Sequence, residues 1–423
     1  MKKTLQEKLH SRKLKRPPLL IYNILGYLWK FMYKKKLNVN FDYKIKLKDY
    51  KGPYIVVSNH ASRMDYIYTG VAFLPHRLNY VAGYNEFFRS HLAFIFRLLK
   101  VIPKKNFVAD IYAIQEFKRI LKKNGKVIIF PEGMSSIGGT NQPSMIGSAK
   151  LLKHCKVPVL MTKISGGYLT NTKYCLDERY GRVDVVIDEL FSVEDLRVLT
   201  EEQIGEKMDE AIYNNDYEYN KKMRVKYNGK GRMAHNLHHL LYHCPKCHND
   251  LTMSGHDNII ECTNCNNKAI LNEYYDLIPD NDNCVIPDTP AKWFDLERSI
   301  MKEKVKDPNF KLEEEVEIGV LPKYEYLKNM ETSQKVGKGL LTLDRNGLTF
   351  EGTKNNEKFS FFIESKNLPT YGMCTDVTFF YTFFEGEYYE FIPTRESTAI
   401  WLHATEEMHR LNGGKWQDFS WKQ

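Results

Sequence analysis

The sequence lacks an apolar run long enough to cross a membrane. Its aromatic-rich segment at residues 19–33 is interrupted by Asn23, Gly26 and Lys30, whereas a spanning helix needs about 20 apolar residues. It also lacks the small-residue cleavage site of a secretory signal, because Lys34 opens a lysine triplet where that site would lie. An interfacial membrane helix fits this segment better, and a helix packed on the protein's own core is the alternative.

Acidic residues are scarce at the beginning of the chain. Residues 1–51 hold fifteen Lys and Arg but only three Asp and Glu, a balance of +12, whereas the whole chain carries +10. The rest of the chain is therefore close to neutral. Such a basic segment attracts anionic lipid or nucleic acid, and the aromatic helix inside it favours lipid. We therefore expect residues 1–48 to form a basic arm with an interfacial helix, which would hold the protein on the cytoplasmic side of an anionic membrane as a peripheral or monotopic protein.

A histidine and a carboxylate follow the first strongly apolar segment. Residues 53–58 read as a strand buried on both faces of a parallel sheet, and ligands bind at the carboxyl ends of such strands. His60 and Asp65 come directly after it, in residues 59–65 (Asn-His-Ala-Ser-Arg-Met-Asp). These two side chains suit a general base and its orienting partner. The alternative is a purely structural role as a helix capping box, because Ser62-x-x-Asp65 also has that pattern.

A second buried strand predicts a carboxylate at the same sheet edge. Residues 126–130 read as an apolar strand, which Pro131 ends. Glu132 and Gly133 follow, so that a carboxylate and a bare backbone would lie at the same edge as His60.

With both motifs, the sequence resembles the glycerol-phosphate and lysophospholipid acyltransferase family. The hallmarks of that family are Asn-His-x-Ser-x-x-Asp, Phe-Pro-Glu-Gly and a later Val-Pro-Val, here at residues 59–65, 130–133 and 157–159. The resemblance covers residues 50–190. It implies transfer of a fatty acyl group from acyl-CoA or acyl-carrier protein to the hydroxyl of a lysophospholipid, with His60 as general base oriented by Asp65.

The resemblance also suggests which residues bind substrate. These are Asn59, Ser62, Lys104, Lys105, Glu132, Gly133 and Ser135. Two departures concern the acceptor, because the family usually has an arginine where this chain has Ser135, and another in the stretch that here reads Lys104-Lys105. The acceptor therefore stays open between 1-acylglycerol 3-phosphate, another lysophospholipid and a glycolipid. A protein that kept the fold but lost catalysis, and binds or regulates at membranes, is the alternative function.

Four cysteines predict a metal centre. Cys244-x2-Cys247 and Cys262-x2-Cys265 are two close pairs that can converge as four thiolates on a tetrahedral Zn²⁺. Disulfides are disfavoured in a cytosolic chain, and a redox pair would not explain the duplication. Four protein ligands leave no open position, so we expect a structural zinc ribbon with no part in acyl transfer.

Three histidines just upstream invite a second metal hypothesis. His235, His239 and His243 would stack on one face of a helix. Without a carboxylate partner at useful spacing, a solvated helix face is the favoured interpretation.

The periodicity divides the chain into an α/β part and a β-rich part, and in the latter Asn346-Gly347 and Glu385-Gly386 predict the turns of two hairpins. The expected fold is an acyltransferase domain with a mostly parallel sheet flanked by helices, then the ribbon, then a barrel-like domain resembling pleckstrin-homology or GRAM modules. Binding to membranes or proteins and simple packing are equally favoured roles for that last domain. The expected segments are the basic arm at 1–48, the acyltransferase domain at 49–220, a basic linker at 221–243, the zinc ribbon at 244–280, and a helix with the β domain at 290–423.

Overall fold

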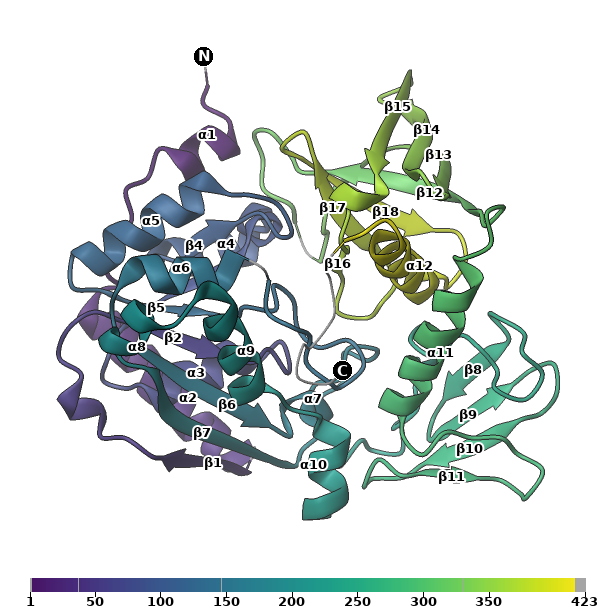
Figure 1. The fold of residues 1–423 in the computed structure, drawn as a ribbon, viewed down its shortest axis with the longest axis horizontal. Coiled ribbons are helices and arrows are strands. Elements are labelled where there is room, and N and C mark those ends of the chain that lie inside the picture. The colour runs from purple at the N-terminus through teal and green to yellow at the C-terminus, as the bar shows by residue number, and fades with distance from the viewer. Residues whose placement is uncertain (1, 37, 146, 329, 415–423) are drawn as a thin grey trace.

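The computed structural model describes residues 2–36, 38–145, 147–328 and 330–414. They form three sheets of seven, four and seven strands, with helices packed around the first and the third (Figure 1). The predicted fold class is confirmed: an α/β domain precedes a cysteine-bearing ribbon and a curled antiparallel sheet. The predicted domain boundaries stay predictions.

The first sheet carries both polar motifs. Its strand order is β1-β7-β6-β2-β5-β3-β4, and neighbours run parallel except β6 and β7. The middle strand β2 is buried along its whole length, as its continuous apolar run predicts. The strands are β1 (Asn38–Tyr43), β2 (Tyr54–Ser58), β3 (Leu78–Gly83), β4 (Ile102–Lys104), β5 (Lys126–Ile129), β6 (Val159–Ser165) and β7 (Arg182–Phe191).

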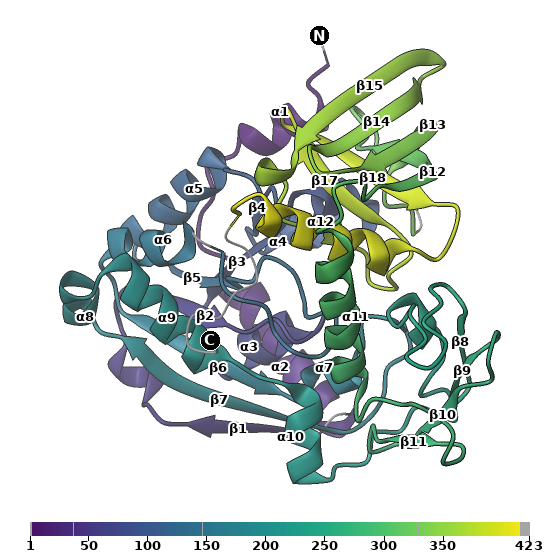
Figure 2. The same ribbon diagram turned by 45° about the vertical axis from the view of Figure 1, so that its right-hand side comes forward.

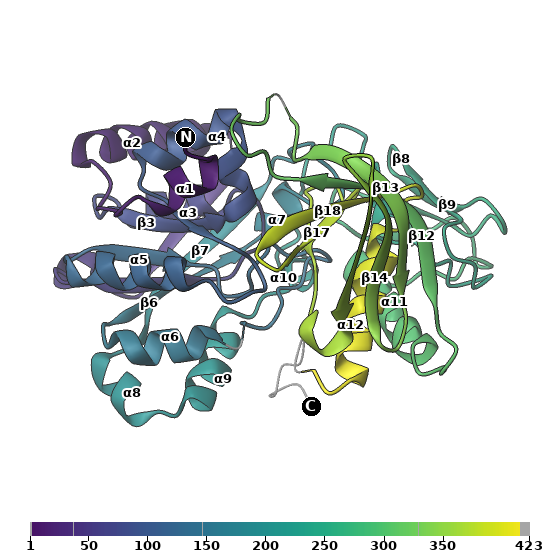
Figure 3. The same ribbon diagram turned by 90° about the horizontal axis from the view of Figure 1, so that it is seen from above.

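Side chains of β2 alternate between two layers of helices. Ile55 and Val57 pack with α5, α6 and α9, whereas Tyr54 and Val56 pack with α3 on the other face. Figure 3 shows α2 and α3 on one side of the sheet and α6 and α9 on the other. The helices of this part are α1 (Leu5–His10), α2 (Leu19–Lys36), α3 (Asp65–Ala72), α4 (Ser90–Leu98), α5 (Ile111–Lys122), α6 (Gly147–Cys155), α7 (Gly167–Thr170), α8 (Val193–Val198), α9 (Glu201–Ile212) and α10 (Asp216–Met223).

The second sheet is the small ribbon. Its order is β11-β10-β9-β8, all antiparallel. The prediction that one helix stacks His235, His239 and His243 is wrong. A short 3₁₀ turn forms instead, at Leu237–His239. An α-helix cannot continue through Asn236, because this residue has a left-handed backbone conformation (φ 62°). The strands are β8 (Met253–His256), β9 (Ile259–Cys262), β10 (Lys268–Leu271) and β11 (Leu277–Pro279).

The third sheet is a curled antiparallel sheet with one helix packed on it. Two predicted hairpins are confirmed, with turns at Asn346-Gly347 and at Glu385-Gly386. In Figure 2, α11 (Pro290–Lys304) runs between the ribbon and α12 (Thr398–Leu411). The order is β15-β14-β13-β12-β18-β17-β16. The strands are β12 (Leu312–Val320), β13 (Gln334–Leu343), β14 (Gly347–Lys354), β15 (Glu357–Glu364), β16 (Gly372–Met373), β17 (Phe380–Phe384) and β18 (Glu387–Pro393).

The third sheet is docked against the first domain. Leu327 N donates to Phe88 O at 2.8 Å, and Ser90 N donates to Leu327 O at 2.9 Å. Phe88 and Leu327 share a hydrophobic core with Tyr381 and Phe383 of β17. The β-rich part therefore packs directly on the domain that holds the motifs.

Within the described ranges, no helix is both long and apolar enough to cross a bilayer.

Candidate active site

Asn59 joins the end of β2 to the neighbouring strand β6. Its side-chain Nδ2 donates to Ile164 O (2.8 Å), and its Oδ1 accepts from Ile164 N (2.7 Å). Because Asn59 is fully buried, these bonds satisfy its amide and fix where the chain leaves the sheet. Its predicted contact with substrate stays a prediction.

His60 and Asp65 meet immediately beyond β2. His60 Nδ1 lies 2.9 Å from Asp65 Oδ2, and the His60 side chain is 24% exposed while the Asp65 side chain is fully buried. Ser62 also holds the carboxylate, since its N donates to Oδ2 (2.8 Å) and its Oγ donates to Oδ1 (2.9 Å). Burial raises the pKa of Asp65, and the hydrogen bonds from His60 and Ser62 oppose that rise. With Nδ1–H donated to the carboxylate, a neutral His60 presents the lone pair of Nε2.

The capping box considered as an alternative forms only in part: Asp65 Oδ2 accepts from Ser62 N (2.8 Å), but Asp65 N donates to Ser62 O and not to Ser62 Oγ. Helix α3 begins at Asp65 itself, and its N-cap residue Met64 makes no side-chain capping bond. Ser62 Oγ instead accepts from Met64 N at 3.2 Å. The Asp65 carboxylate therefore turns back toward His60 and Ser62.

Glu132 ties the segment after β5 to His60. The carboxyl is fully buried; Oε1 accepts from His60 N (2.6 Å) and Oε2 accepts from Gln142 N (2.9 Å). In return, Ser136 N donates to His60 O at 2.7 Å. Burial raises the pKa of Glu132 to about 8. Both oxygens are thus engaged with backbone, which is the geometry of a residue that positions His60; substrate binding by Glu132 stays a prediction.

Gly133 lies where only a glycine fits. Its φ of +82° is in the left-handed region, and a Cβ there would lie 2.9 Å from Met145 Sδ and 3.1 Å from an atom of the Phe107 ring. The segment then closes on itself, because Met145 N donates to Pro131 O at 2.9 Å. Gly133 therefore permits the tight loop that presents the next residues beside His60.

A family comparison agrees with this geometry. Residues 36–165, which include His60, Asp65 and Glu132, match the family model described as Acyltransferase. The chain contains an acyltransferase-family domain. Among solved structures, it is similar to that of the 1-acyl-sn-glycerophosphate (LPA) acyltransferase PlsC from Thermotoga maritima, with 22% identity, a TM-score of 0.39, and coverage of 45% of this chain and 76% of that one. No curated protein matches the sequence significantly.

Lys104 and Lys105 lie on the acyltransferase domain with partners of their own. Lys104 Nζ donates to Lys105 O (3.3 Å), and burial lowers its pKa. Lys105 Nζ donates to Gly386 O in the third sheet (2.5 Å) and lies over the Tyr84 ring at 5.2 Å. In the described part of the chain, no hydrogen bond joins either ammonium to His60. Their contact with a phosphate stays a prediction.

A lysine that the sequence did not single out lies at Ser135 of the acyltransferase domain. Lys173 Nζ donates to Ser135 Oγ (3.2 Å) and to Met373 O of β16 (3.2 Å). The Lys173 side chain is buried, and that burial lowers its pKa to about 8. No motif contains Lys173, and no spacing rule connects it to Ser135, so only the structure reveals this contact.

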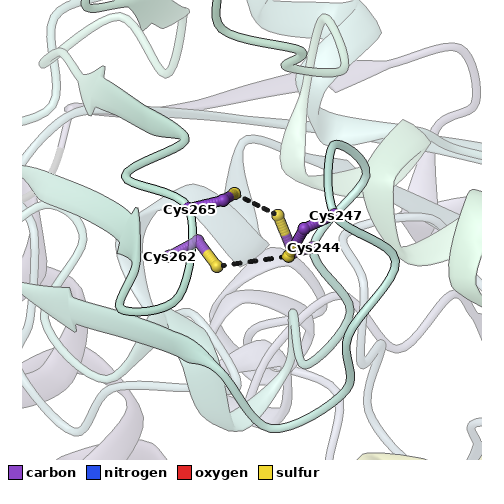
Figure 4. A group of neighbouring side chains, drawn as sticks. All are labelled: Cys244, Cys247, Cys262 and Cys265. Atoms are coloured by element: carbon purple, nitrogen blue, oxygen red, sulfur yellow. Dashed lines mark hydrogen bonds between the residues drawn. The ribbon is translucent and has the colours of Figure 1, made fainter.

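The four predicted cysteines converge in the ribbon that follows the acyltransferase domain. All four Sγ atoms lie within 4.8 Å of one another, with Cys244 to Cys265 at 3.6 Å and Cys247 to Cys262 at 3.7 Å (Figure 4). Tetrahedral zinc with bonds of about 2.3 Å separates its sulfurs by roughly 3.8 Å. The cluster can therefore hold a metal ion, and its four thiols suit zinc; the identity of the ion stays a prediction.

A second group of side chains that can bind metals joins the linker before the ribbon to the segment between β18 and α12. His238 Nε2 lies 3.0 Å from Glu396 Oε2, and His239 Nε2 lies 3.4 Å from Glu396 Oε1. Because His238 Nδ1 accepts from Gly255 N (2.9 Å), its Nε2 carries the proton and donates to Glu396. This arrangement is a hydrogen-bonded His-Glu pair, and His243 instead pairs with Asp250 (2.6 Å).

The buried Glu132 predicts a pH-dependent stability. Its pKa of about 8 exceeds the ordinary 4.5, so the folded chain keeps a proton that the unfolded chain releases between these values. This contribution to the free energy of unfolding is present in full below about pH 4.5 and is lost as the pH rises through 8. Urea unfolding at pH 5.5 and pH 8.5 should show a smaller loss for Glu132→Gln than for the native protein. The exposed Glu202→Gln is the control, and equal losses in native protein and Glu132→Gln contradict the prediction.

The cysteine cluster predicts one zinc ion per chain. Elemental analysis of purified protein should give one equivalent of zinc, and Cys247→Ser should lose most of it because three thiolates bind less tightly. A chelator should lower the melting temperature, since binding energy of a structural metal is folding energy. Cys155→Ser, outside the cluster, should keep both metal and melting temperature. Unchanged zinc content in Cys247→Ser would refute the assignment.

Proposed function

We propose that this protein transfers a fatty acyl group from acyl-CoA or acyl-carrier protein to the hydroxyl of a lysophospholipid. The observation that carries the proposal is the contact of 2.9 Å between His60 Nδ1 and the buried Asp65 carboxylate, on a histidine that remains partly exposed. The family match over residues 36–165 supports the reaction class. The donor carrier and the acceptor are part of the proposal.

The proposed mechanism uses His60 as the general base. Its Nε2 accepts the proton of the acceptor hydroxyl while that oxygen attacks the thioester carbonyl. When the tetrahedral intermediate collapses, the carbon–sulfur bond breaks and the imidazolium returns its proton to the leaving thiolate. Asp65 keeps the Nδ1–H tautomer in place and stabilises the imidazolium. Glu132 acts on the backbone of His60, so its part is positioning.

The alternative is a lipid-binding or regulatory protein without catalysis. Ser135 favours it, because the family arginine is absent at that position. The presence of His60, Asp65 and Glu132 in one hydrogen-bonded arrangement favours the enzyme.

We also propose that α2 binds an anionic membrane surface from the cytoplasmic side. Its outward side chains are apolar and exposed over a large part of the helix, namely Leu19, Leu20, Ile24, Tyr27, Leu28, Phe31 and Met32. An apolar helical face within a basic segment is the pattern of an interfacial helix. Its opposite face packs on the protein's own core through Tyr22 and Leu25. The helix therefore combines a packed face with an exposed apolar face that is available to a membrane.

The acyltransferase proposal predicts loss of turnover without loss of fold in His60→Ala. Thiol release from long-chain acyl-CoA and acyl-carrier protein should depend on a lysophospholipid acceptor. Because a positioned base contributes about 10²- to 10⁴-fold, His60→Ala should lose at least about 10²-fold in kcat while keeping its melting temperature. His91→Ala, at an exposed histidine of α4, is the control. If zinc-loaded native protein releases no thiol with any acceptor, the non-catalytic alternative replaces the enzyme.

The membrane proposal predicts that acidic residues on α2 release the protein from vesicles. Leu20→Asp with Ile24→Asp should sharply reduce sedimentation with phosphatidylserine-containing vesicles, because both side chains are exposed on this helix. Val198→Asp is the control, since Val198 is 72% exposed on α8, on the opposite side of the sheet (Figure 3). Equal sedimentation of the two variants argues against the proposal.

A further inference from the structure

A cavity of about 310 Å³ lies between residues 5–18, here called the N-terminal segment, and the acyltransferase domain. Part of its lining is apolar, and Leu9 of α1, Phe87 and Phe96 of this part pack in one hydrophobic core. Five cationic residues also line it, three from the N-terminal segment and two from α4 and the residues after it, and none of the described lining residues is acidic. The five are Arg12, Lys13, Lys15, Arg97 and Lys100. The cavity thus combines positive charge with an apolar surface.

These five cations are not neutralised within the part of the chain that the structure describes. None of them lies within ion-pair distance of a carboxylate, and Arg97 donates to a neutral group, Tyr326 Oη, at 3.2 Å. The carboxyl of Glu116, which contacts the N-terminal segment, is engaged by Leu14 N (2.7 Å) and by Arg119. Like charges around one cavity repel one another, so an anion that several of them can contact stabilises them.

Hydrogen bonds to backbone hold the two cationic walls of the cavity together. The buried Asn79 donates through Nδ2 to Lys15 O (3.0 Å) and to Lys100 O (2.9 Å), one residue from each wall. Tyr112 Oη donates to Arg12 O at 2.9 Å. Because these bonds use main-chain carbonyls, they fix the chain and leave the charged ends of the side chains for a ligand. Such preorganisation lowers the entropic cost of binding.

The size of the cavity suits a polar headgroup better than a whole lipid. Ligand pockets typically enclose about 300 to 1,000 Å³, and this cavity lies at the lower limit. Acyl chains would remain outside it, where apolar side chains are exposed: Phe94 of α4 is 68% exposed and Leu20 of α2 is 72% exposed. Phe94 and Arg97 are three residues apart in α4 and therefore share a face of that helix. An exposed aromatic ring thus lies beside a cation of the cavity.

Helices α1, α2 and α4 present these groups on one side of the molecule. Figure 3 places all three helices on the same side of the first sheet, and Leu9, Tyr22 and Phe96 of these helices pack in one core. The exposed apolar face of α2 begins at Leu19, only four residues after Lys15. A phosphate in the cavity, with acyl chains along the exposed helices, matches a lipid that stays in the bilayer.

We propose that this cavity binds the headgroup of an anionic phospholipid of the bilayer, with the phosphate on the five cations and the acyl chains along α2 and α4. The lipid is a ligand and not a substrate, since no described residue that lines the cavity is hydrogen-bonded to His60, Asp65 or Glu132. The apolar face of α2 accounts for attachment to any bilayer, whereas the cavity gives a preference for anionic lipid. The proposal takes the position of the bilayer from the membrane binding proposed for α2.

The experiment measures lipid binding in solution, so that it depends neither on turnover nor on attachment to a bilayer. Isothermal titration of full-length, zinc-loaded protein would compare dihexanoylphosphatidylglycerol with dihexanoylphosphatidylcholine, both below the concentration at which micelles form. The two lipids share their acyl chains and their phosphate and differ in net charge. The anionic lipid should bind at least about tenfold more tightly, and raising the salt concentration should reduce that preference.

Variants of the two walls separate a built site from a diffusely basic segment. Arg12→Gln with Lys15→Gln, and separately Arg97→Gln with Lys100→Gln, should each weaken binding of the anionic lipid about tenfold and leave the zwitterionic lipid unchanged. All four residues are at least partly exposed, and the bonds from Asn79 and Tyr112 use their backbone. Both variants should therefore keep the native melting temperature.

Two further variants are the controls. Lys118→Gln with Lys122→Gln removes the same charge from exposed positions of α5 and should bind both lipids as the native protein does. Leu20→Asp with Ile24→Asp should keep the charge preference in solution, although it no longer sediments with vesicles. This difference separates the cavity from the membrane helix.

The proposal is overturned if the two lipids bind equally, if either wall variant keeps the preference, or if the α5 variant loses as much as the wall variants. It is also overturned if coenzyme A or a single-stranded oligonucleotide displaces the lipid and itself needs Arg12 and Lys15, since the cavity would then belong to the acyl donor or to a nucleic acid. Loss of sedimentation in the α2 variant, without a charge preference in solution, supports the membrane helix and contradicts the cavity. A charge preference with unchanged sedimentation of that variant does the reverse.

Discussion

The site depends on one buried carboxyl group, that of Glu132. It accepts hydrogen bonds from the backbone N–H groups of His60 and Gln142. These bonds fix the position of the segment after β2 relative to the loop after β5. Asn59 adds β6 to the same junction through two bonds to Ile164. The ends of three adjacent strands, β2, β5 and β6, are thus joined by side chains that bond to backbone. These bonds determine where the imidazole of His60 lies. Burying this carboxyl group costs free energy. The two backbone N–H groups offset that cost, because each would otherwise be buried without a hydrogen-bond acceptor.

The sequence predicts those parts of the structure in which one segment determines its own conformation. The apolar run of β2, the turn at Asn346-Gly347 and the cysteine spacing are of this kind. Strand β1 was not predicted and its residues were assigned to the basic arm, because an edge strand with mostly exposed polar side chains has no apolar run to reveal it. The contact between Lys173 and Ser135 was missed for a different reason: it depends on how two loops pack, and no local pattern records it.

The ribbon and the third sheet contribute to the surroundings of the site. Met134 and Ile137, which follow Glu132 in the loop, pack in the same hydrophobic core as Leu237 of the linker and Trp401 of α12. A Cβ on Gly138 would lie only 2.7 Å from the Phe294 ring of α11, so the absence of a side chain at Gly138 lets this helix pack closely on the loop. The loop that carries Ser135 is therefore backed by elements far beyond the span of the family match, and Cys244 and Cys262 of the cysteine cluster lie in the same core.

The same packing connects the third sheet, through Lys173, to the loop that carries Ser135. Lys173 donates to the carbonyl of Met373 on β16, and β16 is the last strand of the sheet, paired with β17. β17 in turn shares a core with Phe88 and Leu327, through which the sheet docks on the acyltransferase domain. Lys173 also donates to Ser135 Oγ, so a single buried ammonium joins β16 to the loop after Glu132, and the docking of the sheet contributes to holding that loop beside His60.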